Sequence, residues 1–137
     1  MTIVTPSAAA FVPRMVAECD DLVMNSLAFV RTHLAMDIAY VLEFVGDEIV
    51  FCAVSAPGFE GNFAVGGTRP PKSGYFHHIV AGRLPELIPD TAYEPLAQTI
   101  PVTHKLPIRS YVSVPIRRTD GTVYGMFAAL AKPRALR

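Results

Sequence analysis

Residues 110–130 read SYVSVPIRRTDGTVYGMFAAL, and this stretch has the pattern of a β-hairpin. Two runs rich in β-branched and aromatic residues flank Thr119-Asp120-Gly121, and an Asp-Gly pair favours a tight reversal of the chain. Both runs are apolar on both faces in their central parts, so we expect other elements to cover both faces. Pro115 has no backbone N–H and therefore predicts a bulge or a gap beside its strand.

A second hairpin is predicted upstream of the first. The runs from Ile38 to Val45 and from Glu48 to Ser55 are strand-like, and Gly46-Asp47 between them marks the turn. Before this hairpin, residues 15–36 carry apolar side chains at helical spacing, which predicts the longest helix of the chain. Its apolar surface extends beyond one narrow stripe, so we expect it to contact both its own sheet and a second subunit.

A long loop and a short helix are predicted between the two hairpins. Residues 56–71 are rich in Gly and Pro and show no periodicity. Loops of this length inside compact domains are usually functional or mobile. The segment from Ser73 to Ala81 then predicts a short helix, which Gly82 ends as the residue after its C-cap.

The remaining residues before the last hairpin predict one more strand and one more helix. Residues 86–89 form a brief extended piece, and Thr91 and Glu94 have the spacing of a capping box for a helix that ends before Pro101. Residues 101–109 are interrupted by prolines and predict a loop. The whole order indicates an α+β fold with an antiparallel sheet.

Length and composition indicate one domain over residues 1–137. Most domains contain roughly 100–150 residues, and an apolar content of 51% is enough for a core without disulfides or a metal. We expect residues 1–13 to be a loose lead-in and residues 132–137 a basic tail. The formal net charge is zero and no basic stripe is present, which argues against a nucleic-acid partner.

Neither a membrane span nor a disulfide is predicted. No stretch approaches the roughly 20 apolar residues that a spanning helix needs, and the N-terminus lacks the pattern of a signal peptide. Cys19 and Cys52 lie among apolar neighbours in a helical and a strand pattern, which fits free thiols in a reducing compartment. We therefore expect a cytoplasmic protein.

Four segments carry a resemblance to a known family. They read HLAMDIAYVLEFVGDEIVF (33–51), YFHHIVAGRLPELIPDT (75–91), LPIRSYVSVPI (106–116) and GTVYGMFAAL (121–130). The Val-Pro-Ile at 114–116, followed by a turn and Tyr-Gly, is the most characteristic pairing. Together they resemble a GAF domain, the small-ligand sensor module of bacterial signalling proteins. The resemblance implies a twisted antiparallel sheet with the long N-terminal helix packed behind it and a pocket in front, under short helices and loops.

The same resemblance implies a regulatory role rather than catalysis. It implies a sensor domain that binds a small molecule and relays the change through helix-mediated dimerisation to a signalling output domain or protein. The family has no shared catalytic set, so we expect no enzymatic activity. Many similar sequences have a cysteine at the position of Phe76, and its absence excludes covalent attachment of a bilin there. Cys19 and Cys52 lie outside the predicted pocket loops, which argues against thiol chemistry.

Two adjacent histidines, His77 and His78, raise the question of a metal site. Neighbouring residues on a helix differ by about 100° in direction, so the two rings are not expected to converge on one ion. The positions one helical turn away hold no strong metal ligand. We therefore expect no metal, with one imidazole toward the pocket or core and the other toward water.

Haem is an alternative cofactor, and His104 would be its ligand. This histidine lies in the loop before the Val-Pro strand. In this respect the chain resembles haem-binding GAF domains, which have a haem-ligating histidine in that loop. A neutral imidazole beside an apolar pocket is what axial ligation requires. A lone loop histidine is more often exposed, so the leading prediction remains a pocket without a cofactor.

The predicted pocket is mostly apolar with a few polar groups near its mouth. The candidate ligand-binding residues are Tyr75, His78, Asp90, His104, Arg109 and Ser113. Each also has a structural interpretation, such as a helix cap for Asp90 or a surface charge for Arg109. We expect only some of them to line the pocket.

A dimerisation module with a vestigial pocket is the alternative function. The helix over residues 15–36 would form a two-fold interface in a homodimer, with Leu27 and Phe29 among its contacts. The ligand itself and the output partner are not specified by any motif.

Overall fold

The computed structural model describes residues 22–61, 63–70 and 73–133 of the chain. Within these residues six strands form a single antiparallel sheet in the order β3-β2-β1-β6-β5-β4. The strands are β1 (Ile38–Val45), β2 (Glu48–Ser55), β3 (Thr68–Arg69), β4 (Leu87–Ile88), β5 (Ser110–Arg117) and β6 (Val123–Ala131). The predicted α+β class with an antiparallel sheet is confirmed.

The two predicted hairpins form the centre of the sheet. β1 pairs with β2 and β5 pairs with β6, and the two hairpins join where β1 pairs with β6, from Ile38 opposite Leu130 to Glu43 opposite Gly125. Both predicted turns are present, and their glycines, Gly46 and Gly121, adopt positive φ angles of 60° and 91°. Glycine adopts this conformation without the steric cost that a side chain brings.

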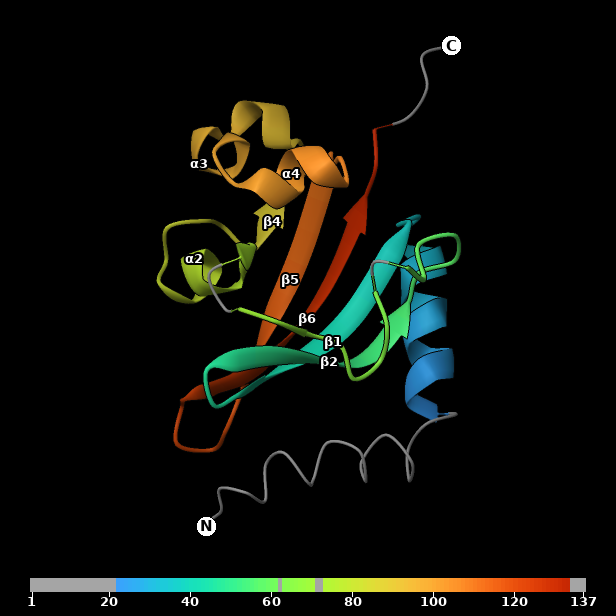
Figure 1. Ribbon diagram of the computed structural model, residues 1–137, viewed down its shortest axis with the longest axis vertical. Coiled ribbons are helices and arrows are strands. Elements are labelled where there is room, and N and C mark those ends of the chain that lie inside the picture. Colours follow the sequence, from blue (N-terminus) through green and yellow to red (C-terminus); the bar gives the residue numbers. More distant parts are fainter. Residues whose placement is uncertain (1–21, 62, 71–72, 134–137) are drawn as a thin grey trace.

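Helices lie on opposite sides of this sheet. Residues 22–33 form a helix that packs behind β1 and β2, while α2 (Phe76–Val80), η2 (Thr91–Tyr93), α3 (Pro95–Gln98) and α4 (Pro101–Lys105) belong to the front. Figure 1 shows the front helices gathered near β4 and β5, with the helix over 22–33 at the other side of the molecule. The first part of the predicted helix over 15–36 lies outside the described residues.

Alternation along β1 divides the interior into two clusters. Tyr40 and Leu42 belong to the large front cluster, whereas Ala39 and Val41 belong to a smaller cluster behind the sheet with Leu27. Successive side chains of a strand point to opposite faces, so one strand contributes to both. Small alanines at the back leave room for the helix over 22–33 to approach the sheet closely.

Three local predictions need correction. Residues 101–105 form helix α4 instead of a loop, because Pro101 occupies the first turn, where a missing N–H costs nothing. Asp90, not Thr91, caps η2 by accepting a hydrogen bond from the Ala92 N–H, while the Thr91 hydroxyl donates to the Ile108 carbonyl. The segment predicted as a loop over 56–71 contains strand β3.

Within the described residues, none of the helices combines the length and the apolar character that crossing a bilayer requires.

Candidate functional site

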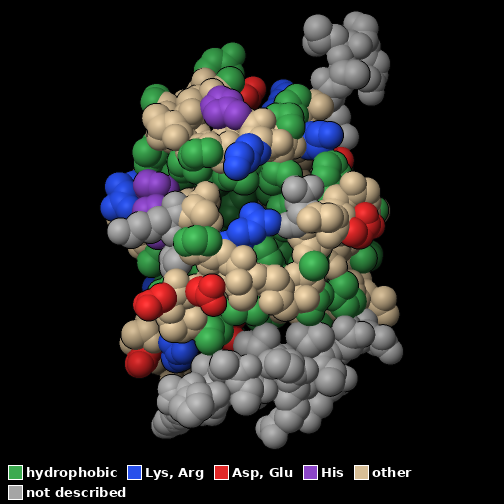
Figure 2. All heavy atoms as spheres, in the orientation of Figure 1, with side chains coloured by type: hydrophobic (Ala, Val, Ile, Leu, Met, Phe, Trp, Pro, Cys, Tyr) green, Lys and Arg blue, Asp and Glu red, His purple; other side chains and the backbone are tan. Residues whose placement is uncertain are grey.

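A cavity of about 50 Å³ lies in front of the sheet, between the strands and the front helices. Its walls come from β1, β2, β3, β5 and β6, from the start of α2 and the segment that leads into it, and from α4 and the residues that follow it. Figure 2 shows the corresponding hollow in the middle of this face, with hydrophobic walls and basic side chains beside it. The lining residues are Tyr40, Leu42, Ile49, Phe51, Phe63, Arg69, Ser73, Gly74, Tyr75, Phe76, Val102, Leu106, Ile108, Tyr111 and Leu130.

Aromatic rings form much of this wall and hold one another in place. The ring of Tyr40 stacks on Phe63 with centroids 5.6 Å apart and meets Phe51 edge-on at 5.2 Å. On the other side, Tyr75 meets Tyr111 edge-on at 4.7 Å. Edge-to-face and offset contacts are the favoured geometries of aromatic pairs, so these walls are preorganised.

Two hydroxyl networks border the cavity. The hydroxyls of Tyr40 and Tyr111 lie 3.1 Å apart, and the Tyr111 hydroxyl is 3.9 Å from the Met126 sulfur. The Tyr75 hydroxyl is hydrogen-bonded to Thr103, whose own hydroxyl donates to the Ala97 carbonyl at 2.6 Å. Since the Thr103 proton goes to Ala97, Tyr75 is the donor in the first bond. The network therefore ties the start of α2 to α4 across the front of the cavity.

Burial keeps these phenols neutral. It raises the pKa of Tyr40 to about 12 and the pKa of Tyr111 well above its usual value of 10.0. Burial also raises the pKa of Tyr75. Low polarity disfavours the phenolate, so each hydroxyl keeps its proton near neutral pH and can act as a donor.

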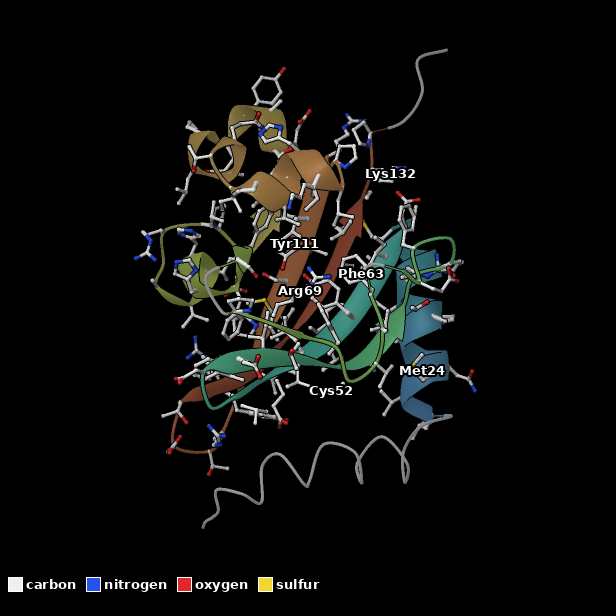
Figure 3. The ribbon with its side chains drawn as sticks, viewed as in Figure 1. Met24, Cys52, Phe63, Arg69, Tyr111 and Lys132 are labelled. Carbon is white, nitrogen blue, oxygen red and sulfur yellow. The ribbon has the colours of Figure 1, made fainter. Side chains whose placement is uncertain are left out.

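Arg69 is a charged residue of the cavity wall that the sequence analysis did not single out. It belongs to the two-residue strand β3 and its guanidinium lies over the rings of Phe51 and Phe63, at 5.6 and 5.8 Å from their centroids. In Figure 3 this side chain lies in front of the sheet near Tyr111 and Phe63. Strand β3 is too short to produce a periodic signal, so nothing in the sequence distinguished Arg69 from other loop arginines.

Of the six predicted ligand-binding residues, Tyr75 lines the cavity. His78 lies on α2 outside its walls, with its Nδ1 accepting a hydrogen bond from Arg83 at 3.1 Å. Partial desolvation, His77 and Arg83 together lower the pKa of His78. A ligand inside the cavity would therefore not contact this imidazole.

The other four predicted residues have structural contacts away from the cavity. Asp90 caps η2 and lies 3.8 Å from Arg109, whose side chain is 51% exposed. Ser113 is buried, and its hydroxyl oxygen lies 3.4 Å from the Glu86 carbonyl oxygen. His104 is exposed on α4, with Nε2 2.8 Å from the Gln98 carbonyl oxygen. A haem ligated by His104 would therefore lie outside the cavity described here.

The adjacent histidines do not diverge as expected. The rings of His77 and His78 contact each other, with centroids 3.9 Å apart and planes tilted by 42°. Among the described residues, no three His, Cys, Asp or Glu side chains are grouped closely enough to hold a metal ion.

Cys52 lies outside the cavity walls, at a register shift where β1 and β2 are paired irregularly. Burial, with a smaller contribution from Glu43, raises the pKa of its thiol to about 12. A thiol in that state is a poor nucleophile, because the thiolate is the reactive form. The other cysteine, Cys19, lies outside the described residues.

The structure thus combines an antiparallel sheet, a helix behind it and an aromatic cavity in front of it. The family model described as GAF domain matches residues 18–136 of the chain. The chain therefore belongs to the GAF domain family, a family of regulatory small-molecule sensor domains.

Solved structures share this fold at low sequence identity. The phycocyanobilin-bound GAF domain of a cyanobacterial phytochrome has a TM-score of 0.63 and 15% identity, covering 100% of this chain and 85% of its own. NreA of Staphylococcus aureus, mutated in its nitrate binding site, has a TM-score of 0.60 and 16% identity over 86% and 88% of the two chains. The GAF domain of the Acinetobacter phosphoenolpyruvate-protein phosphotransferase has a TM-score of 0.61 and 13% identity over 98% and 83%. No curated protein sequence matches the chain.

Proposed function

We propose that this chain is a regulatory domain that binds a small molecule in the aromatic cavity and transmits its occupancy to a signalling partner. The observation that carries the proposal is the cavity itself, which has preformed aromatic walls and only a few polar groups. Ligand sites are usually of this kind, because apolar walls give affinity and a few polar groups fix orientation. The related domains described as bound to phycocyanobilin or as having a nitrate site are compatible with ligand binding on this fold.

A physical path for transmission runs through β1 and β2. Tyr40 and Phe51 face the cavity, while Ala39 and Ala53 on the same strands contact the cluster behind the sheet that contains Leu27. The helix is also tied to β2 because the Arg31 Nε donates to the Ser55 hydroxyl at 2.8 Å. A ligand that favours one position of these strands would therefore shift the helix over 22–33, provided that it binds the two conformations unequally.

The helix over residues 22–33 is also proposed to contact a second copy of the chain. Leu22 and Phe29 are 73% and 70% exposed, and their separation of seven residues places both on one face of the helix. Leu27, by contrast, is buried against the sheet, so it supports the fold of its own subunit and Phe29 is the residue available to a partner. If the cavity proved to be vestigial, this dimer would remain as the function.

The proposed site predicts a specific effect of filling the cavity. Val102 lies in its wall on α4, and Val102→Trp adds an indole where a ligand would bind. The small-molecule fraction of an extract of the source organism is expected to raise the melting temperature of the wild type but not that of Val102→Trp. Thermal unfolding by circular dichroism measures both.

His78→Trp is the matched control, because it adds the same side chain on α2 outside the cavity walls. This variant is expected to respond to the fraction as the wild type does. An equal shift in Val102→Trp and the wild type would place the binding site elsewhere. If the response were abolished in His78→Trp but kept in Val102→Trp, the binding site would lie beside His78, as the sequence analysis predicted.

A further inference from the structure

The charges around the cavity are one-sided. Among the described residues that line the cavity, Arg69 carries a positive charge, and none is Asp or Glu. The phenols of Tyr40, Tyr75 and Tyr111 remain neutral, since burial raises the pKa of each. The cavity therefore presents a cation and neutral donors to a ligand, without a carboxylate that would repel an anion.

The guanidinium of Arg69 is held at one side of the cavity in a fixed position. It lies over two aromatic faces, Phe51 and Phe63, and is half-buried. A planar guanidinium offers parallel N–H donors that match the two oxygens of a carboxylate. Reduced contact with water also strengthens such a pair compared with one on an open surface.

The tyrosine pair of the cavity wall also offers a hydroxyl proton. The hydroxyls of Tyr40 and Tyr111 are 3.1 Å apart and share one hydrogen bond, although together they carry two protons. The second proton has the sulfur of Met126 at 3.9 Å as a neighbour, and a thioether is a weak acceptor. A ligand oxygen or a water held with the ligand is a better acceptor for this proton.

The size of the cavity limits the enclosed part of a ligand. A volume of about 50 Å³ takes roughly four water molecules, since each needs about 10–15 Å³ on this scale. A cavity that encloses a whole benzene has a volume of about 150 Å³, so this one has room for a short alkyl group or for part of one ring. The aromatic walls favour a flat apolar body.

We propose that the cavity binds a compact organic monocarboxylate, with its carboxylate against Arg69 and its apolar body among the rings of Tyr40, Phe63 and Tyr111. The inference rests on the proposed function, because it assigns a chemical class to the ligand of the same cavity.

Benzoate and benzamide form the test pair, because they have nearly the same shape and differ in charge. Titration calorimetry at millimolar concentrations is expected to show binding of benzoate to the wild type and at least tenfold weaker binding of benzamide. This comparison uses the unaltered protein, so it does not depend on how any variant folds.

Arg69→Met removes the charge and is expected to weaken benzoate binding by about tenfold or more, since a hydrogen bond to a charged group is lost. Arg118→Met is the matched control, because Arg118 also lies over an aromatic ring, that of Tyr124 at 5.1 Å, but outside the cavity. It is expected to bind benzoate like the wild type. Cooperative unfolding of both variants without ligand tests whether they are folded. If Arg69→Met is not folded, Arg69→Lys replaces it and is expected to bind benzoate with intermediate affinity.

Three results would overturn the inference. Equal binding of benzoate and benzamide would leave the cavity as a binding site but remove the preference for anions. Unchanged benzoate binding in Arg69→Met would remove Arg69 from the site. Absence of binding by either compound would reject small carboxylates, while the response of the wild type and Val102→Trp to the extract fraction would still decide the proposed function separately.

Discussion

Gly125→Ala is expected to destabilise the protein by about 3 kcal/mol, and by more if the strands cannot move apart. Gly125 lies in β6 opposite Glu43 of β1, where the two hairpins join into one sheet. A Cβ at this position would overlap the Leu42 carbonyl oxygen and lie 3.4 Å from the Glu43 Cα. Both neighbours are backbone atoms within a paired strand, so relief requires distortion of the sheet itself. Chemical denaturation measures the change in the free energy of unfolding.

Gly61→Ala is the control for this prediction. A Cβ at Gly61 would have no heavy atom within 4 Å, and this residue does not have a positive φ. Its free energy of unfolding is expected to stay within about 0.5 kcal/mol of the wild-type value. Equal stabilities of Gly125→Ala and Gly61→Ala would show that β1 and β6 are not as close as described.

Leu27→Glu is the second change with a large expected effect, a loss of about 3–5 kcal/mol. Leu27 is 4% exposed and packs on Ala39, Ala53 and Ala129 behind the sheet. A carboxylate there would lose its hydration among apolar groups, so it would either stay uncharged or force the helix away. Urea denaturation at neutral pH measures the loss, which is expected to decrease at low pH, where protonation removes the charge.

Phe29→Glu separates the fold from the proposed dimer. Phe29 is two residues from Leu27, nearly opposite on the helix, and 70% exposed. The stability of the single subunit is therefore expected to change little. Sedimentation velocity is expected to show a dimer for the wild type and a monomer for Phe29→Glu. Equal loss of stability in Leu27→Glu and Phe29→Glu would contradict the described orientation of the helix.

The central strands were predictable because their sequence signals are local. β1 and β2 have the bounds that β-branched composition and the Gly46-Asp47 turn indicated. The C-terminal end of α2 was also predictable, since Gly82 adopts the positive φ of 80° expected after a C-cap. These features depend on neighbours in the chain, so the sequence displays them directly.

The missed elements depend on distant contacts or on ambiguous residues. β3 contains two residues and forms by pairing Arg69 with Ile49, which no local pattern announces. Pro101 is compatible with either a loop or the first turn of a helix, and the buried contacts of α4 decide between them. Thr91 matched a capping box, but its hydroxyl donates to the Ile108 carbonyl, which comes close only in the folded protein.

The candidate site was less predictable than the fold. Tyr75 was found because it begins the segment that resembles the family, whereas Tyr40 and Tyr111 looked like ordinary strand residues. Their hydroxyls meet across a separation of 71 residues in the chain. Polar residues on the short helices, such as His78 and His104, were chosen for their chemistry, but the sequence did not show that they face away from the cavity.

Native mass spectrometry after incubation with the small-molecule fraction tests most directly whether the cavity binds a ligand. The wild-type protein is expected to retain one small molecule that denaturation releases, and Val102→Trp is expected to retain none, because its indole occupies the cavity. A bare protein mass for the wild type, or the same bound molecule on Val102→Trp, would contradict the assignment of this cavity as the sensor site.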